Sequence, residues 1–500
     1  MTELLTNLAL GFAVAGTTTN LAYCLIGVLI GTLVGVLPGI GSLAAISLLL
    51  PVSFHMPPTS AIILLSGIYY GAEYGGSITS ILLNLPGTSS SAVTCLDGNP
   101  MARQGKAGVA LFMTTIASFA GATLGIIALI VLAPILAQLA RQIASAEFFA
   151  IMLFALVASA TITQGSPLKG LAMVVLGLML GAIGTDVETG ISRFTMGLYP
   201  LYDGVSLVAL AMGLFGVSEV IGSVVGSRNT LIDRSVPLRS MVPSRDDLRR
   251  SWRPILRGFG IGGLLGALPG AGVTISSFLA YAVEKRVSRE PSRFGKGAIE
   301  GICAPESANN AAAQTAFIPT LTIGIPGSAT MAIMLGALMI HGISPGPAMV
   351  SEHPEIFWGL IASFWIGNLL LLVINIPLIG IWVRLLLVPY AYLFPVVIGL
   401  VCIGAFAIAT DVFNVWIVLL AGLAGYALRL ARYEPAPLLI GFVLGPLIEE
   451  NFRRAMLLAR GDLAYFLDRP ITMAFVALTV ILLARPLLGY LRHIGKNRFA

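Results

Sequence analysis

Long apolar runs interrupted by Pro-Gly breaks limit how this chain can fold. Apolar stretches of roughly 17 to 25 residues, the length of a membrane-crossing helix, recur along the whole sequence. Only helices and closed barrels satisfy their backbone in lipid, and long runs without alternation favour helices. Only 10% of the 500 residues are charged, against about 25% in soluble domains. We expect an all-α polytopic membrane protein of roughly 10 to 12 transmembrane segments.

Positive charge is concentrated in two segments. Residues 228–257 contain eight Arg and three Asp, and residues 284–296 contain five Lys or Arg and two Glu. Their net charges of +5 and +3 leave −2 for the rest of a chain whose total is +6. Clusters that flank apolar runs indicate cytoplasmic loops, so we expect no nucleic-acid partner. Arg453, Arg454 and Arg460 conflict with this rule, because counting crossings places them on the opposite side.

One broken apolar segment occurs twice. Residues 31–41 and 262–272 match at seven of eleven positions with a constant offset of 231, and both contain Leu-Pro-Gly-x-Gly. Basic residues flank the second copy on both sides, whereas the first copy has none beside it. The ends of the second copy should therefore lie in the cytoplasm and those of the first in the periplasm. We expect two re-entrant hairpins that enter from opposite faces, as in transporters built from inverted repeats.

The two copies divide the chain into halves. We expect an N-terminal surface helix (1–16), a first membrane repeat (17–227), a cytoplasmic basic linker (228–257), a second, inverted repeat (258–470) and an extra C-terminal helix with a basic tail (471–500). Further spans are expected near 59–83, 107–138, 146–165, 170–185, 205–225, 357–387, 391–410, 413–430, 436–449 and 471–489. Five crossings separate the first hairpin from the linker, and this odd number makes the halves inverted.

Each half contains a second break, which follows an acidic residue. Glu73 lies in an apolar helix interrupted at Pro86-Gly87, and Glu306 precedes an interruption at Pro326-Gly327. A broken membrane helix leaves backbone groups unpaired, at a cost of several kcal/mol each unless something polar satisfies them. Half-helix N-termini carry partial positive charge, and the small and hydroxyl residues after each break suit carboxylate oxygens. Packing alone could explain one kink, but four paired breaks favour an anionic substrate.

The substrate site is expected where the breaks meet near the midplane. The candidate substrate-binding residues lie at or just after a break, or one turn beyond Glu306: Pro38, Gly39, Gly41, Ser42, Pro86, Gly87, Thr88, Ser89, Ser90, Gly270, Gly272, Thr274, Asn309, Asn310, Pro326, Gly327 and Ser328. No Lys or Arg lies deep within the expected spans. We therefore expect amide dipoles, hydroxyls and co-transported cations to balance the negative charge of the anion.

Backbone and hydroxyl oxygens near the second breaks are candidate ligands for Na⁺, which prefers hard oxygen donors. These coupling-ion candidates are Thr79, Asn84, Thr322 and Gly324. Ordinary helix-to-helix hydrogen bonds are the alternative for the Thr hydroxyls. Glu73 and Glu306 could gate the site, couple protons or form structural hydrogen bonds. The cysteines and histidines form no ligand or catalytic set, so we expect no transition metal, no cofactor other than a coupling ion, and no enzymatic activity.

Five motifs together resemble the large membrane subunit of the tripartite tricarboxylate transporters (TctA type). They are Leu37-Pro38-Gly39-Ile-Gly41, Tyr70-Gly-Ala-Glu73-Tyr-Gly-Gly-Ser77, Asn84-Leu-Pro86-Gly87-Thr88, Asp97-Gly-Asn-Pro100 and Ala304-Pro-Glu306-Ser-Ala-Asn309-Asn310. The resemblance covers essentially the whole chain. It implies a multi-pass secondary transporter of the bacterial inner membrane that works with a small membrane subunit and a periplasmic solute-binding protein.

The resemblance also implies uptake of citrate-like tricarboxylates or dicarboxylates by cation symport, with Na⁺ or H⁺ as the coupling ion. An elevator motion follows from fold analogy alone, and the subunit pair could assemble into a dimer of heterodimers. The alternative functions are a stand-alone anion carrier or channel and, less favoured, a membrane-embedded hydrolase, for which the sequence offers no recognisable nucleophile and base.

Overall fold

The protein is helical almost throughout the part of the chain that the computed structural model describes. That part comprises residues 2–37, 40–162, 166–186, 188–226, 237–268, 272–386, 395, 398–399, 401–406 and 411–497. Its β structure is one antiparallel pair, β1 (Gly184–Thr185) and β2 (Ser192–Arg193). The helices long and apolar enough to cross a membrane are Thr18–Val36, Cys95–Ala140, Pro354–Asn375 and Val412–Leu430, with seven shorter apolar helices beside them. The expected all-α, multi-pass membrane class is confirmed, whereas the number of crossings stays a prediction.

The first repeated segment joins α2 (Thr18–Val36) to α3 (Gly41–Leu49). A row of glycines at every fourth position of α2, Gly27, Gly31 and Gly35, packs against α4 (Pro58–Leu83). A Cβ at Gly31 would lie 2.3 Å from the carbonyl oxygen of Ile68. Small residues of this kind allow membrane helices to approach backbone to backbone. The α2–α3 pair is thus fixed along the length of α4.

The second repeated segment has the same packing. It joins α11 (Arg245–Gly266) to α12 (Gly272–Val287), and α11 packs on α13 (Glu300–Thr315) through Gly258, Gly262 and Gly266. Each of these glycines lies 231 residues after its counterpart in α2. A Cβ at Gly262 would lie 2.0 Å from the carbonyl oxygen of Ala308. The repeated sequence therefore corresponds to a repeated helix contact.

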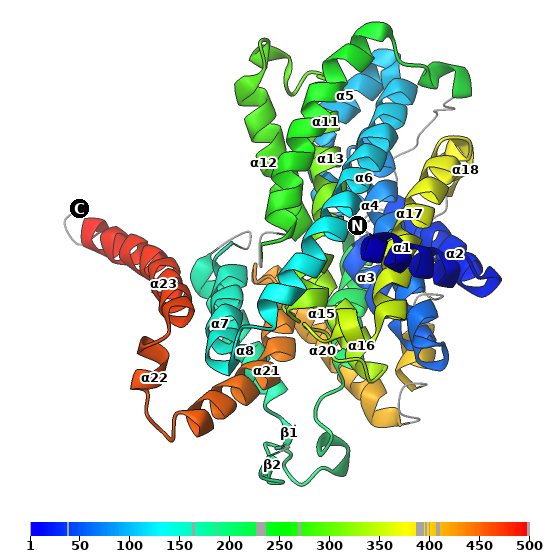
Figure 1. Ribbon diagram of the computed structural model, residues 1–500. Coiled ribbons are helices and arrows are strands. Elements are labelled where there is room, and N and C mark those ends of the chain that lie inside the picture. Colours follow the sequence, from blue (N-terminus) through cyan, green and yellow to red (C-terminus); the bar gives the residue numbers. More distant parts are fainter. Residues whose placement is uncertain are drawn as a thin grey trace.

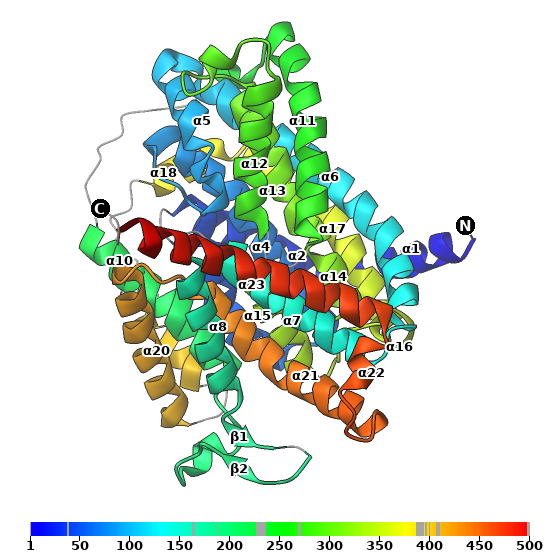
Figure 2. The same ribbon diagram turned by 90° about the vertical axis from the view of Figure 1, so that its left-hand side faces the viewer.

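These hairpins and their neighbours form one group of helices, called here the hairpin group (Figures 1 and 2). It consists of α1 to α6 and α11 to α18. Its remaining members are α1 (Thr2–Ala15), α5 (Cys95–Met101), α6 (Ala107–Ala140), α14 (Phe317–Thr322), α15 (Ala329–Ile340), α16 (Met349–Glu352), α17 (Pro354–Asn375) and α18 (Ile379–Leu385). α6 packs along α13 and α1 along α17. The core of the hairpin group contains the Phe364 ring. The centroid of this ring lies 5.0 Å from that of Tyr70 and 4.9 Å from that of Phe317.

The other helices form a second group, the wall group, seen face-on in Figure 2. It consists of α7 (Ser145–Ile162), α8 (Pro167–Gly181), α9 (Leu207–Ala211), the π-helical turn η5 (Met212–Val217), α10 (Ser218–Gly226), α20 (Val412–Leu430), α21 (Ala436–Leu458), α22 (Ala464–Leu467) and α23 (Pro470–Asn497). Within it α21 packs on α8 and α7, and α20 packs on η5. The wall group meets the hairpin group mainly through α3 and α15.

The helices follow the expected spans with two differences. α11 begins at Arg245, so the second half of the expected linker already belongs to a hairpin helix, whose start is capped by the Ser244 hydroxyl and the Asp247 carboxylate. The expected span 357–387 is divided into α17 and α18. Most of the expected span 391–410 lies outside the described residues.

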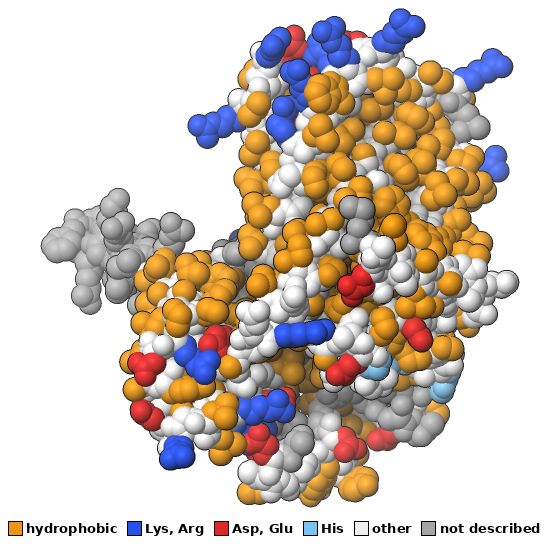
Figure 3. Space-filling view, in the orientation of Figure 1, with side chains coloured by type: hydrophobic (Ala, Val, Ile, Leu, Met, Phe, Trp, Pro, Cys, Tyr) orange, Lys and Arg blue, Asp and Glu red, His pale blue; other side chains and the backbone are white. Residues whose placement is uncertain are grey.

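Basic side chains gather at the end of the hairpin group formed by the outer ends of α11 and α12, at the top of Figure 3. Two of the three arginines that conflict with the charge rule, Arg453 and Arg454, form ion pairs. Arg453 bonds to Asp186 at 2.8 Å, to Glu188 at 3.3 Å and to Glu449 at 2.6 Å, and Arg454 bonds to Glu450 at 2.5 Å. The Arg453 guanidinium holds the pKa of the Asp186 carboxyl well below its usual range. Arg453 and Arg454 thus face matching negative charge.

Candidate substrate site

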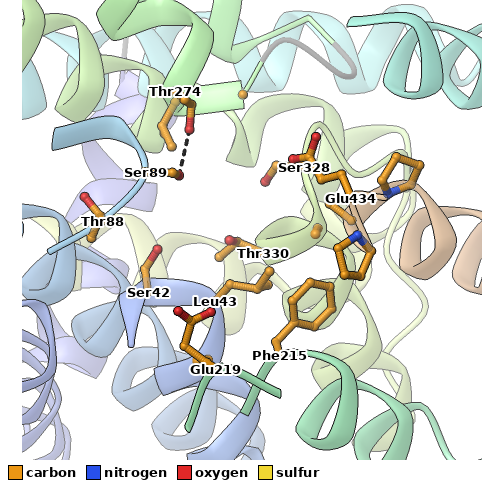
Figure 4. A pocket seen from close by; sticks show the side chains of 18 of the residues that line it. Ser42, Leu43, Thr88, Ser89, Phe215, Glu219, Thr274, Ser328, Thr330 and Glu434 are labelled. Atoms are coloured by element: carbon orange, nitrogen blue, oxygen red, sulfur yellow. Dashed lines mark hydrogen bonds between the residues drawn. The ribbon is translucent and has the colours of Figure 1, made fainter. Parts of the chain in front are cut away.

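A cavity of about 660 Å³ lies between the hairpin group and the wall group. Four segments of the hairpin group line it, and Figure 4 shows their polar side chains facing a common space. These segments are residues 40–44, 86–89, 272–275 and 327–330. They are the residues that follow, or contain, the four Pro-Gly breaks. The structure thus brings to one cavity the Pro86-Gly87 break, Gly327 of the fourth break, and the residues that follow the other two breaks. Pro38, Gly39, Pro269 and Gly270 themselves lie outside the described residues.

Three helices of the hairpin group begin at the cavity, α3, α12 and α15, and α21 of the wall group also begins there. Gly41 and Gly272, the first residues of α3 and α12, have φ angles of 66° and 59°. An L side chain in this left-handed region costs roughly 1–2 kcal/mol, so glycine suits both positions. Nothing within 4 Å would meet a Cβ at Gly41. The N-terminal amides of these helices therefore border open space and carry partial positive charge toward it.

The second breaks pack against the hairpins. A Cβ at Gly87 would lie 2.1 Å from the carbonyl oxygen of Gly35 in the first hairpin, and one at Gly327 would lie 3.5 Å from that of Gly266 in the second. The halves also meet directly, because the hydroxyls of Ser89 and Thr274 are 2.9 Å apart (Figure 4). The first-half break and the second hairpin therefore contact each other at the cavity.

Glu73 borders this cavity and is 1% exposed. The Ser42 hydroxyl, on α3, donates to Glu73 Oε1 at 2.7 Å, and the Ser90 hydroxyl, after the first-half break, donates to Oε2 at 2.6 Å. Glu73 therefore connects a hairpin to a break. Of the roles that the sequence leaves open for it, a hydrogen bond to the neighbouring hairpin is observed.

Glu306 is equally buried, at 1% exposed, but does not line the cavity. Its carboxylate accepts hydrogen bonds from Ser77 at 3.1 Å, Thr94 at 2.6 Å and Ser118 at 3.2 Å. These donors join α4, the turn before α5, and α6 to α13. Glu306 holds the interior of the hairpin group together and contacts neither hairpin through these bonds.

The wall group supplies the opposite side of the cavity, which the sequence did not predict. Arg429, in the last turn of α20, forms an ion pair with Glu219 of α10, and both residues line the cavity. The adjoining loop contributes Arg432 and Tyr433. Lys169 fixes this loop by donating to the carbonyl oxygen of Ala431 at 2.7 Å and lying 4.5 Å from the Tyr433 ring centre.

The remaining predicted residues lie near the cavity lining but not in it. Ser90 bonds to Glu73, and Asn310 donates to the carbonyl of Glu306 in its own helix at 3.0 Å. Thr79 donates to the Val36 carbonyl of α2 at 3.0 Å, which is the helix-to-helix hydrogen bond considered as the alternative, whereas Thr322 donates to the Ile318 carbonyl of its own helix at 2.7 Å. Absent from the lining are Ser90, Asn309, Asn310, Pro326, Thr79, Asn84, Thr322, Gly324 and Glu306.

Arg429, Glu219, Arg432, Ser159, Phe215 and Thr330 are lining residues that sequence reasoning missed. Arg429 and Glu219 lie near the ends of expected spans, where charged residues are ordinary, so position alone did not distinguish them. Glu219 lies at the start of α10 and Arg429 at the end of α20, and their charges are opposite. These opposite charges were the sequence signal from which the ion pair could have been predicted.

Comparisons with known proteins assign the chain to a family. The profile of the Tripartite tricarboxylate transporter TctA family matches residues 21–440. An uncharacterized 52.8 kDa protein in the TAR-I ttuC' 3' region of Agrobacterium vitis is 47% identical over 495 residues, 98% of each chain. An uncharacterized protein in the TAR-II ttuC' 3' region of the same organism is 50% identical over 231 residues, which are 46% of this chain and 96% of the relative. No solved structure matches. With a profile that spans both hairpins and all four breaks, the chain belongs to the tripartite tricarboxylate transporter TctA family.

Proposed function

We propose that this chain is the transport-competent subunit that carries tricarboxylates or dicarboxylates, citrate-like acids among them, through the cavity between its two helix groups. The family is one of transporters and not of enzymes. The observation that carries the proposal is the convergence of three helix N-termini and Arg429 on one cavity. Backbone amides at helix starts and a guanidinium are suitable donors to carboxylate oxygens.

Movement of the hairpin group past the wall group is the transport mechanism that we propose. All four break segments belong to the hairpin group, whereas Ser159, Phe215, Glu219 and Arg429 belong to the wall group. The equivalent glycine contacts of α2 with α4 and of α11 with α13 support descent of the halves from one repeat. Opposite insertion of the two repeats and an elevator-like displacement are parts of this proposal.

Uptake driven by Na⁺ or H⁺ across the bacterial inner membrane completes the proposal. The TctA family works with a small membrane subunit and a periplasmic binding protein, so we propose that both serve this chain and that the pair of membrane subunits can form a dimer of heterodimers. Thr79, Asn84, Thr322 and Gly324 remain candidate Na⁺ ligands because Thr79 and Thr322 are fully buried beside broken helices.

The test is uptake of a radiolabelled panel of di- and tricarboxylates into proteoliposomes that contain the chain and the small membrane subunit. A Na⁺ gradient at equal pH and a pH gradient without Na⁺ are applied separately, each with and without the binding protein. We expect accumulation of at least one acid under one gradient when the binding protein is present. Uptake that is the same with and without the binding protein would instead support a stand-alone carrier.

Counterflow in the same vesicles separates a carrier from a channel. A carrier exchanges external label for unlabelled substrate inside, so internal substrate should raise the initial rate of label entry. If internal substrate has no effect on label entry, and label entry follows the concentration gradient of the acid alone, the chain is a channel. The proposed movement of the hairpin group past the wall group is then wrong.

A further inference from the structure

Glu73 is a buried carboxylate whose charge nothing in the described structure balances. It is 1% exposed, and the groups that interact with it are Ser90, Ser42, Asn309 and Thr88, none of which is cationic. Two titratable groups face it, Tyr69 from its own helix and Glu306 from α13, and neither supplies positive charge. Buried charges in proteins are normally paired or bind a cation, because an unpaired ion in a low-dielectric interior is strongly unfavourable.

A second observation points to an occupant beside this carboxylate. The side-chain amide of Asn309 lies beside Glu73 and is 1% exposed. Neither its Nδ2 nor its Oδ1 has a hydrogen-bond partner by geometry among the described residues. Buried amide oxygens are nearly always satisfied. An acceptor without a donor, next to a carboxylate without a cation, defines a place for a positively charged ligand.

This place is directly connected to the anion cavity. Ser42 and Thr88 line the cavity, Ser42 donates to Glu73, and the Thr88 hydroxyl is 2.9 Å from that of Ser90, which also donates to Glu73. While Glu73 is ionised, the Ser42 and Ser90 hydroxyls are used by its oxygens. An ionised Glu73 would also repel an incoming carboxylate. Neutralising Glu73 removes that repulsion and frees hydroxyls for the anion.

We propose that Glu73 takes up one monovalent cation, H⁺ or Na⁺, together with the anion, and that this shared site couples the two. A proton would add to one carboxylate oxygen, which could then donate to Asn309 Oδ1. A Na⁺ ion would use the carboxylate, Asn309 Oδ1 and neighbouring hydroxyl oxygens, which are the hard donors it prefers. The inference rests on the proposed function and assigns its coupling site.

Glu306 provides the matched control, because its burial is the same and its connections differ. Its three donors come from inside the hairpin group, and it does not line the cavity. A cation or proton on Glu306 would therefore have no direct contact with the anion. We assign to Glu306 a structural role and to Glu73 the coupling role.

The test compares Glu73→Gln with Glu306→Gln in counterflow and in gradient-driven uptake. A Gln side chain has the shape of a neutral carboxyl group, but it carries no charge and can neither take up nor release a proton or Na⁺. We expect Glu73→Gln to lose accumulation, and we expect the substrate affinity in the counterflow that remains to be independent of the cation, a dependence of about 5- to 150-fold in coupled systems. Glu306→Gln should retain that dependence. The Na⁺ and pH arms of the uptake assay identify which cation is used.

Two results would overturn the assignment. One is cation-driven accumulation by Glu73→Gln at the wild-type level. The other is loss of counterflow along with accumulation while the variant stays folded in the membrane, since that would make Glu73 a substrate or structural residue only. Cation dependence lost in Glu306→Gln and kept in Glu73→Gln would place the coupling site elsewhere.

Thermal unfolding in detergent tests the cation site without transport. A ligand that binds the folded state raises the melting temperature by mass action. NaCl, compared with choline chloride, or lowered pH should shift wild-type melting without substrate, and the shift should be absent in Glu73→Gln. If wild type shows this shift but carries no carboxylate, the proposed function is wrong and the cation site stands. If Glu73→Gln shows the full shift, the cation site is wrong.

Discussion

The wall of the cavity presents one ion pair to the helix starts opposite. Arg429 and Glu219 are both partly exposed to the cavity, with 35% and 20% of their side chains accessible. An anion that enters can compete with Glu219 for the guanidinium, because carboxylate–guanidinium bonds tolerate exchange of one carboxylate for another. Arg429 thus adds a guanidinium donor, whose charge Glu219 balances, to a site that the sequence predicted to rely on amides, hydroxyls and cations.

Neutralising Arg429 and neutralising Glu219 should have opposite effects on the KM for the anion. Arg429→Gln should raise the KM for the anion roughly tenfold or more, because a hydrogen bond to a charged group contributes about 1.5–3 kcal/mol and Glu219 would be left unpaired. Glu219→Gln should leave the KM unchanged or lower it, since Arg429 is then free for the substrate. Initial uptake rates over a concentration series measure both. Equal increases in KM would show that the pair is only structural.

Each hairpin is held to the following helix by backbone contact rather than by interlocking side chains. The glycine rows of α2 and α11 leave no room for a Cβ against α4 and α13. Such close approach favours van der Waals and Cα–H···O contacts along the whole helix pair. A hairpin packed in this way has little freedom to tilt against its partner.

Replacing one of these glycines should loosen the hairpin. Gly262→Ala would place a Cβ 2.0 Å from the Ala308 carbonyl oxygen, and overpacking of this kind costs about 1–3 kcal/mol. We expect a lower melting temperature in detergent. Gly260→Ala, on the same helix but with nothing within 4 Å of its added Cβ, is the control and should melt as wild type or slightly higher. Equal melting of both variants would contradict the contact.

Much of this element-level structure could be predicted because it depends on local chemistry. The offset of 231 between Gly31 and Gly262 is visible in the sequence, as are the Pro-Gly breaks that end the helices. Which helix receives the glycine row could not be predicted, since a small residue fits any close neighbour. The pairing of Arg453 with Asp186, 267 residues apart, likewise depends on tertiary contact.

At the scale of the whole molecule, two helix groups meet along a narrow contact beside the substrate cavity. α3 and α15 of the hairpin group touch η5, α9 and α21 of the wall group. The break residues that line the cavity could be grouped from sequence because the breaks repeat, whereas Ser90, Asn309, Asn310 and Pro326 were expected in the site and are absent from the lining. The division into two groups, and therefore the far wall of the cavity, could not, since no sequence feature marks which apolar helices pack together.

A disulfide across this contact should stop transport if the groups move past each other. A Cβ at Gly216 of η5 would lie 3.2 Å from Leu48 Cγ of α3, so Leu48→Cys with Gly216→Cys, in a background without the native cysteines, is suited to cross-linking. We expect uptake to be lost on oxidation and restored by a reductant. Full uptake by the cross-linked protein would show that this contact stays fixed during transport.

A matched cross-link within the hairpin group is the control. A Cβ at Gly359 of α17 would lie 3.4 Å from Val14 Cβ of α1, within the reach of a disulfide. Val14→Cys with Gly359→Cys should leave uptake insensitive to oxidation, because both helices belong to the hairpin group.

The glycine row of α2 also has a consequence for biosynthesis. The sequence has a Pro-Gly break between α2 and α3, and unpaired backbone at such a break is unfavourable in lipid. The surface on which α2 packs belongs to α4, which is made later. α4 ends at Leu83, 34 residues after α3 ends at Leu49. At synthesis rates of about 5–20 residues per second, this gap lasts roughly 2 to 7 seconds. We therefore expect the first hairpin to stay with the insertion machinery until α4 is made, so that the two segments enter the bilayer as one unit.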